Sequence, residues 1–217
     1  MKNNGLLIVI SGFSGAGKGT LMKRLVEDYS NYALSVSMTT RQPRAGEENG
    51  REYFFATREE FEKKIGEEGF IEYASYCENY YGTPRDYVES QMAGGKDVIL
   101  EIEIQGAMQI KKKYPHAILL FVTPPGAGAL QERLMGRGTE TEEEIVKRLK
   151  RAAEEAVGIE EYDYIIINDD LDECVKELHA LLQESHHGHV EKYDPRHHKE
   201  FIEEIRTQLQ ELVKGEK

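Results

Sequence analysis

Apolar residues along this chain gather in short runs that are separated by segments with helical periodicity. The first run covers residues 6–10 and leads into a glycine-rich turn. Continuous apolar runs of this length are typical of strands that are buried on both faces of a parallel sheet. Further runs of this kind lie at residues 98–100, 118–122 and 165–167.

Helical spacing characterises the segments between these predicted strands. After the glycine-rich turn, Leu21, Met22, Leu25 and Val26 recur at intervals that place them on one side of a helix. The same periodicity predicts helices at residues 107–113, 129–135, 145–157 and 171–183. Strands that alternate with helices predict an α/β fold, with a mostly parallel sheet flanked by helices.

Two insertions interrupt this alternation. Between residues 37 and 96, the runs 53–55 and 70–73 predict strands around a short helix, which Thr57 and Glu60 open with a capping-box pattern. We therefore expect a domain over residues 1–185, with a core at 1–36 and 97–185 and an inserted α+β lobe at 37–96. A second, polar insertion predicts a small lid at about residues 137–150, where Thr141 marks a helix start.

The tail at residues 186–217 differs from the rest of the chain. It begins with a segment that contains His186, His187, His189, His197 and His198. We interpret this segment as solvated and polar rather than as a metal site, because no fixed pair has helical or finger spacing. Apolar residues then recur at three- and four-residue intervals from 201 to 213, which predicts an amphipathic helix. This helix either packs on its own core or pairs with another chain, so a monomer and a homodimer both stay open.

Composition narrows the class of protein. The chain has 217 residues and a formal net charge of −12. Such an acidic chain is a poor non-specific binder of nucleic acid or anionic membranes, so we expect neither as a partner. Cys77 and Cys174 lie far apart and are expected to be reduced thiols. The first apolar run is too short for a signal peptide or a membrane span, and we therefore expect a cytoplasmic protein.

The strongest motif is the glycine-rich segment at residues 12–20, which reads G-F-S-G-A-G-K-G-T between a predicted strand and a predicted helix. Glycines allow the backbone to approach a phosphate closely, and the start of a helix adds the positive end of its dipole. Lys18 can reach the β- and γ-phosphates. The motif predicts a nucleoside triphosphate site that consists of Gly12, Phe13, Ser14, Gly15, Ala16, Gly17, Lys18, Gly19 and Thr20.

Gly19 departs from the usual pattern, in which Ser or Thr directly follows the lysine. The hydroxyl that commonly binds Mg²⁺ is therefore absent or displaced by one residue, to Thr20. We expect Mg²⁺ to be held mainly by phosphates and water, which suits its reluctance to lose its hydration shell.

Further blocks carry polar side chains suited to a nucleotide. They lie at residues 35–47, 49–53, 70–73, 79–83, 101–106, 137–141 and 168–170. In this order, and together with the glycine-rich segment, they closely resemble the guanylate kinases over about residues 5–184. The resemblance implies a P-loop core with a GMP-binding lobe and a lid. It also implies Mg²⁺-dependent transfer of the ATP γ-phosphate to GMP and a role in purine nucleotide metabolism.

Arginine and tyrosine side chains in these blocks suit the phosphate of an acceptor nucleotide. Arg41 and Arg44 can donate charge-assisted hydrogen bonds to a phosphate dianion. Tyr53 and Tyr81 can add hydroxyl donors. We expect all four side chains to bind the GMP phosphate.

Other residues suit the guanine base. Glu72 can accept from guanine N1–H and N2–H₂, which adenine lacks as a pair, and Thr83 can donate to O6. By resemblance, Ser37 and Glu103 also line this nucleotide. Glu101 lies at the carboxyl end of the predicted strand at 98–100, where it could order Mg²⁺ through water.

The resemblance also implies roles in the transfer step. Arg133, Arg137 and Arg148 belong to the lid and its hinge and clamp the transferring phosphoryl group, while Asn168 lies near the adenine of ATP. The expected catalytic residues are Lys18, Arg41, Arg137 and Arg148. Because positioning and charge stabilisation carry most of phosphoryl transfer, no general base is expected.

Two alternatives stay open. One is a non-catalytic guanylate-kinase-like domain that binds peptides, against which the intact loop and Lys18 argue. The other is a kinase for a different nucleoside monophosphate, such as AMP or CMP. Glu72 and Thr83 argue against that second reading, because they match guanine.

Overall fold

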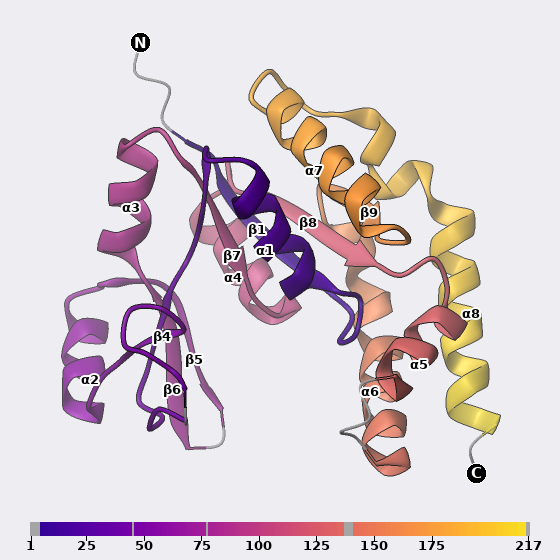
Figure 1. The fold of residues 1–217 in the computed structure, drawn as a ribbon, viewed down its shortest axis with the longest axis horizontal. Coiled ribbons are helices and arrows are strands. Elements are labelled where there is room, and N and C mark those ends of the chain that lie inside the picture. Colours follow the sequence, from indigo (N-terminus) through magenta and orange to yellow (C-terminus); the bar gives the residue numbers. More distant parts are fainter. Residues whose placement is uncertain (1–4, 45, 77, 137–140, 216–217) are drawn as a thin grey trace. The chain divides into compact units, whose positions relative to one another are not determined.

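The computed structural model describes residues 5–44, 46–76, 78–136 and 141–215. The chain forms two compact units. The first consists of Met1–Val9 and Tyr29–Ala117, and the second of Ile10–Asp28 and Ile118–Lys217. Strand β1 (Leu7–Gly12) contributes residues to both units (Figure 1).

Parallel strands form the base of the first unit. Strand β2 (Tyr32–Leu34) pairs in parallel with β7 (Asp97–Glu101), in the order β2-β7-β1. The apolar run predicted as a strand is fully buried at Val98, Ile99 and Leu100. The helix α3 (Arg85–Ala93) packs against β7, and α4 (Ile104–Lys113) follows β7 in the chain.

The second unit continues the same architecture. Its strands β8 (Ile118–Thr123) and β9 (Tyr164–Ile167) pair in parallel, in the order β1-β8-β9, and β8 is buried along its whole length. The helices of this part are α1 (Lys18–Asp28), α5 (Ala127–Met135), α6 (Glu142–Glu155) and α7 (Leu171–Ser185). Parallel strands with flanking helices confirm the predicted α/β class.

A second sheet lies in the first unit, within the predicted lobe. Its strands are β3 (Ser37–Thr39), β4 (Tyr53–Phe55), β5 (Phe70–Tyr76) and β6 (Asn79–Pro84), in the order β4-β3-β6-β5. Strand β3 is parallel to β4 and antiparallel to β6. The sequence patterns did not predict β2, β3, β6 or α3. The lobe's limits at residues 37 and 96 lie inside the first unit and stay a prediction.

Capping boxes open the two helices for which the sequence suggested them. At α2 (Arg58–Gly66), the Thr57 side chain accepts from the backbone of Glu60, whose carboxylate accepts from the backbone of Thr57. Thr141 and Glu144 make the same pair of bonds at α6. These reciprocal bonds satisfy backbone donors that helix starts leave unpaired, and so they fix where both helices begin. Residues 137–140 of the predicted lid lie outside the described residues.

The tail packs on its own chain. It contains the short 3₁₀ helices η2 (Glu191–Tyr193) and η3 (Pro195–His197), followed by α8 (Lys199–Gly215). Helix α8 lies against α5, α6 and the 3₁₀ helix η1 (Ala156–Glu161), as Figure 1 shows at the yellow end of the chain. Of the two placements that the sequence left open for this helix, the structure shows the one on the core of the chain itself.

Histidines in the tail take part in local contacts. The ring of His189 stacks on Tyr164, and its Nε2 lies 2.8 Å from the buried carboxylate of Asp194. Nε2 of His198 lies 2.8 Å from the carbonyl oxygen of Lys192. Within the described ranges, no group of three or more His, Cys, Asp or Glu side chains is arranged to hold a metal ion. In the same ranges, no helix has the length and apolar character needed to cross a membrane.

Candidate functional site

The glycine-rich segment links β1 to α1, which begins at Lys18 as predicted. Gly15 and Gly17 have φ values of +100° and +85°, a region that residues with side chains rarely adopt. A Cβ atom on Gly17 would lie 2.6 Å from Nδ2 of Asn168. Both the backbone conformation and the close approach therefore require glycine at this position.

Lys18 folds back over the loop that precedes it. Its Nζ donates to the carbonyl oxygens of Gly12 at 2.7 Å and of Phe13 at 3.0 Å. These bonds hold the ammonium group against the first residues of the loop, at the start of α1. Gly19 and Thr20 follow on the first turn of the helix and are exposed. The loop thus presents a cation and a helix N-terminus together, which is the arrangement that binds anions.

Three polar side chains predicted for the triphosphate site come from later elements of the second unit. Asn168, which follows β9, is buried and donates from Nδ2 to the carbonyl oxygen of Ala16 at 2.8 Å. Arg148 on α6 donates to Oγ of Ser14 at 2.5 Å. Arg133 on α5 donates to the carbonyl oxygen of Asp169 at 3.3 Å. The predicted catalytic residue Arg137 lies outside the described residues.

Asn168 and Arg148 therefore contact the loop itself. The amide of Asn168 holds the loop backbone, and its predicted place near the adenine stays a prediction. Sequence reasoning had grouped these residues by resemblance, whereas the structure gives the two of them a direct mechanical link to residues 14–16.

Aromatic and basic side chains gather on one face of the second sheet. Ser37 on β3 lies opposite Tyr53 on β4, so both side chains point to the same face. The Arg41 guanidinium lies 5.4 Å from the centre of the Tyr53 ring. The rings of Tyr53 and Tyr81 meet edge to face, with their centres 6.0 Å apart. The sheet thus brings together four of the residues predicted for the acceptor nucleotide.

Glu47 joins this cluster, although sequence reasoning gave it no role. Its Oε1 lies 2.9 Å from Nη2 of Arg41, and its Oε2 accepts from the backbone N–H of Arg44 at 2.7 Å. The hydrogen bond from Arg41 is the largest cause that lowers the pKa of Glu47 below its ordinary value. The signal was the spacing of an acidic residue six positions after Arg41. Arg44 itself is exposed.

Glu72 and Thr83 form a pair on neighbouring strands. Oγ1 of the fully buried Thr83 donates to Oε1 of Glu72 at 2.7 Å. Burial raises the pKa of Glu72, and the bond from Thr83 opposes this shift only in part. The carboxylate is thus oriented by a hydroxyl that sequence reasoning had assigned to the base. Donation from Thr83 to guanine O6 stays a prediction.

The two remaining acidic candidates lie at the carboxyl end of β7. Glu101 is its last residue, and Glu103 is the residue that precedes α4; both are exposed. This is the edge of a parallel sheet at which ligands bind in open α/β folds. The structure therefore places both carboxylates where the sequence predicted them.

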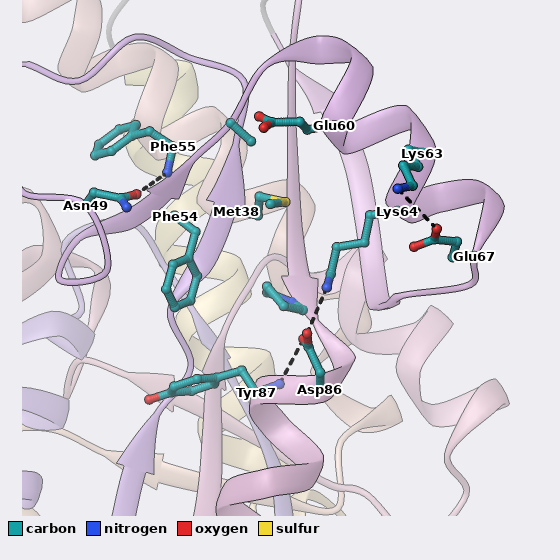
Figure 2. A pocket seen from close by; sticks show the side chains of 12 residues that line it. Met38, Asn49, Phe54, Phe55, Glu60, Lys63, Lys64, Glu67, Asp86 and Tyr87 are labelled. Carbon is teal, nitrogen blue, oxygen red and sulfur yellow. Dashed lines mark hydrogen bonds and ion pairs between the residues drawn. The ribbon is translucent and has the colours of Figure 1, made fainter.

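The opposite face of the second sheet carries the larger of two cavities in the first unit. It measures about 740 Å³ and is lined by Met38 and Phe54, which alternate with Ser37 and Tyr53 along their strands. Figure 2 shows how Lys64 reaches Asp86 across this cavity, at 3.0 Å. The predicted GMP residues do not line it. The smaller cavity, of about 480 Å³, includes Arg41 in its wall.

Comparison with known proteins gives consistent matches. The family model described as Guanylate kinase matches residues 4–185. A guanylate kinase of Caldanaerobacter subterraneus subsp. tengcongensis is 50% identical over 182 residues, which cover 84% of this chain and 88% of that protein. One from Latilactobacillus sakei is 46% identical over 187 residues, covering 86% and 92%. The crystal structure of guanylate kinase from Anaplasma phagocytophilum is similar with a TM-score of 0.66 at 33% identity, over 86% of this chain and 88% of that one.

Proposed function

This chain belongs to the guanylate kinase family, and from that premise we propose that it transfers the γ-phosphate of ATP to GMP, giving ADP and GDP. The observation that carries the acceptor assignment is the Glu72–Thr83 pair, beside the cluster of Arg41, Tyr53 and Tyr81. A carboxylate oriented for two donors and a basic, hydroxyl-bearing cluster match the two ends of GMP.

ATP binds to the second unit in this proposal. The backbone of residues 12–20 surrounds the phosphates, and Lys18 exchanges its bonds with the loop carbonyls for bonds to the β- and γ-phosphates. Arg148 and Arg133 supply positive charge, with Arg137 as a third contributor. Asn168 keeps the loop in shape and lies near the adenine.

GMP binds to the first unit. Arg41 and Arg44 hold its phosphate, aided by the hydroxyls of Tyr53 and Tyr81. Glu72 accepts from guanine N1–H and N2–H₂. Adenine offers no such pair, so it would leave a half-buried carboxylate unpaired, at a cost that favours GMP. Ser37, Thr83 and Glu103 complete this site.

The transfer step needs no general base, because the attacking phosphate oxygen is already ionised. The two nucleotides must meet in line with water excluded, and the cations must follow the charge on the transferring group. Lys18, Arg41, Arg137 and Arg148 are the residues we assign to this role.

Mg²⁺ fits these residues as an ion that is held mostly by phosphate oxygens and water. Gly19 has no hydroxyl to offer, while Thr20 and Glu101 are exposed oxygen donors of the type that Mg²⁺ prefers. When bound, the ion neutralises charge on the phosphates. We also assign the enzyme to purine nucleotide metabolism in the cytoplasm, as a monomer or homodimer without nucleic-acid or membrane partners, which its net charge of −12 supports.

A coupled assay of ADP release tests the proposal. ATP is supplied with GMP, AMP, CMP, UMP or no acceptor, in separate reactions at equal concentration. We expect turnover with GMP far above the others. Equal turnover with AMP or CMP would assign a different acceptor. No turnover with any acceptor, together with binding of a peptide partner, would favour the non-catalytic alternative.

A further inference from the structure

Helix α8 lies outside the segment that the guanylate kinase family model matches, which ends at residue 185. Its apolar side is nevertheless part of the core of the second unit: Ile202, Ile205 and Leu209 are at most 1% exposed. The helix packs against α5, α6 and η1, so it covers the two helices that carry Arg133 and Arg148.

Gln208 of α8 caps the start of α5. The residue that precedes α5 is Gly126, which has no side chain to accept a hydrogen bond from the first turn. Oε1 of Gln208 accepts from the backbone N–H of Ala127 at 3.0 Å instead. A Cβ atom on Gly126 would lie 3.2 Å from this same oxygen, which shows how closely Gln208 approaches. The capping group that α5 lacks locally is thus supplied by the tail.

Arg206 of α8 holds the end of α6. Its Nε donates to the carbonyl oxygen of Ala156 at 2.9 Å, and its Nη2 donates to that of Val157 at 3.3 Å. Ion pairs with Glu160 and Glu203 fix the guanidinium in this position. A cation at the carboxyl end of a helix also interacts favourably with the helix dipole. The tail therefore holds one end of each helix.

Helices α5 and α6 in turn contact the phosphate loop. A Cβ atom on Gly15 would lie 2.9 Å from Leu134 and 3.0 Å from Leu130, so both α5 leucines lie directly against the loop backbone. From α6, Arg148 donates to Ser14 at 2.5 Å. A shift of either helix along its axis would thus move a wall of the loop.

We propose that α8 positions the phosphate loop for ATP through α5 and α6, with Gln208 and Arg206 as positioning residues. The inference rests on the proposed ATP site and extends it to a segment outside the matched region. It predicts that the tail acts on the ATP side of the reaction and leaves GMP recognition unchanged, because all of its contacts named here lie in the second unit.

Two variants of the full chain test this inference while the apolar contacts of α8 are kept. Gln208→Leu removes the acceptor at similar volume, and Arg206→Met removes the donors but keeps most of the stem. Gln210→Leu places the same substitution at an exposed position of α8. Glu204→Ala removes only the other partner of Gln208, whose Nε2 donates to Glu204 at 3.0 Å. The KM for each nucleotide, kcat and the melting temperature are measured for all four variants.

We expect the KM for ATP to rise about fivefold in each positioning variant, the factor that corresponds to one lost helix-capping bond. The KM for GMP should stay at the wild-type value, and both controls should match wild type in every parameter. A lower melting temperature with unchanged kinetics, or an equal rise in both KM values, would overturn the inference.

Hydrogen exchange and ATP titration separate this inference from the proposed reaction. In Gln208→Leu, amide exchange over residues 12–20 and 127–134 should quicken, and the affinity for ATP alone should fall. Both readouts apply even if the wild-type protein does not phosphorylate GMP. Wild-type exchange in the loop, together with wild-type ATP affinity, would contradict the positioning role directly.

Discussion

Replacement of Glu72 by Gln tests base recognition with the least disturbance of the fold. Thr83 can donate to the amide oxygen of Gln as it donates to the Glu72 carboxylate, at 2.7 Å in the structure. The amide then directs its NH₂ group at the base. Two donors of guanine would therefore meet a donor instead of a carboxylate oxygen.

The magnitude follows from the bond that is lost. A hydrogen bond to a charged group contributes about 1.5–3 kcal/mol, and each 1.4 kcal/mol is about a factor of ten in an equilibrium or rate ratio. We therefore expect kcat/KM for GMP to fall by about 10- to 150-fold. The kcat/KM for AMP should hold or rise, because an amide NH₂ can donate to adenine N1.

Stability supplies an independent check on folding. Burial raises the pKa of Glu72 above its ordinary value of 4.5, so ionisation of this group costs stability in the folded state. The stability that Glu72 contributes is fully present below its ordinary pKa and is lost as the pH rises through the raised value. Glu72→Gln has no such loss, and its melting temperature at about pH 8 should be at least that of wild type.

Steady-state kinetics with GMP and AMP, paired with thermal melting, measure both effects. A GMP/AMP ratio of kcat/KM that equals the wild-type ratio would refute the role of Glu72. A variant that loses activity together with a large loss of melting temperature would refute the physical account of its environment.

Three further predictions concern the loop and the acceptor cluster. Glu47→Gln weakens the hold on Arg41, and the KM for GMP should rise about three- to tenfold while the KM for ATP stays constant in steady-state assays. Gly17→Ala forces a side chain into a conformation with φ of +85° and against Asn168 at 2.6 Å; calorimetry should show a loss of stability of about 1–3 kcal/mol and weakened ATP binding. In the wild-type enzyme, the KM for GMP should rise as the pH falls through the raised pKa of Glu72, because the protonated carboxyl loses one acceptor oxygen; a pH profile in which both KM values rise together would contradict this.

The strands of the core could be predicted because each carries a signal in its own residues. Strand β8 is buried on both faces, and its composition is continuous and apolar for that reason. The capping boxes at Thr57 and Thr141 are equally local, since each involves residues three positions apart. These features depend on no distant part of the chain.

Elements whose stability comes from distant partners escaped prediction. Strand β3 has only three residues and exists because β4 and β6 pair with it on either side. Strand β6 reads N-Y-Y-G-T-P, in which turn-forming and polar residues hide the pairing with β5. The cap that Gln208 gives to α5 joins residues 81 positions apart, and no local pattern marks it.

The candidate site divides in the same way. The glycine-rich loop and Lys18 follow from a local motif, whereas the acceptor residues were found by resemblance and by the chemistry of guanine. Glu47 was missed because its role depends on the turn that brings it back to Arg41, with 2.9 Å between the charged groups.

Product analysis with labelled ATP tests the central claim most directly. The protein is incubated with Mg²⁺, ATP labelled at the γ-phosphate, and equal amounts of GMP and AMP, and the nucleotides are separated. We expect the label in GDP, with one ADP formed for each GDP, and we expect Lys18→Ala to abolish both products. Label released as free phosphate, label in ADP derived from AMP at the level of GDP, or undiminished turnover by Lys18→Ala would contradict the account.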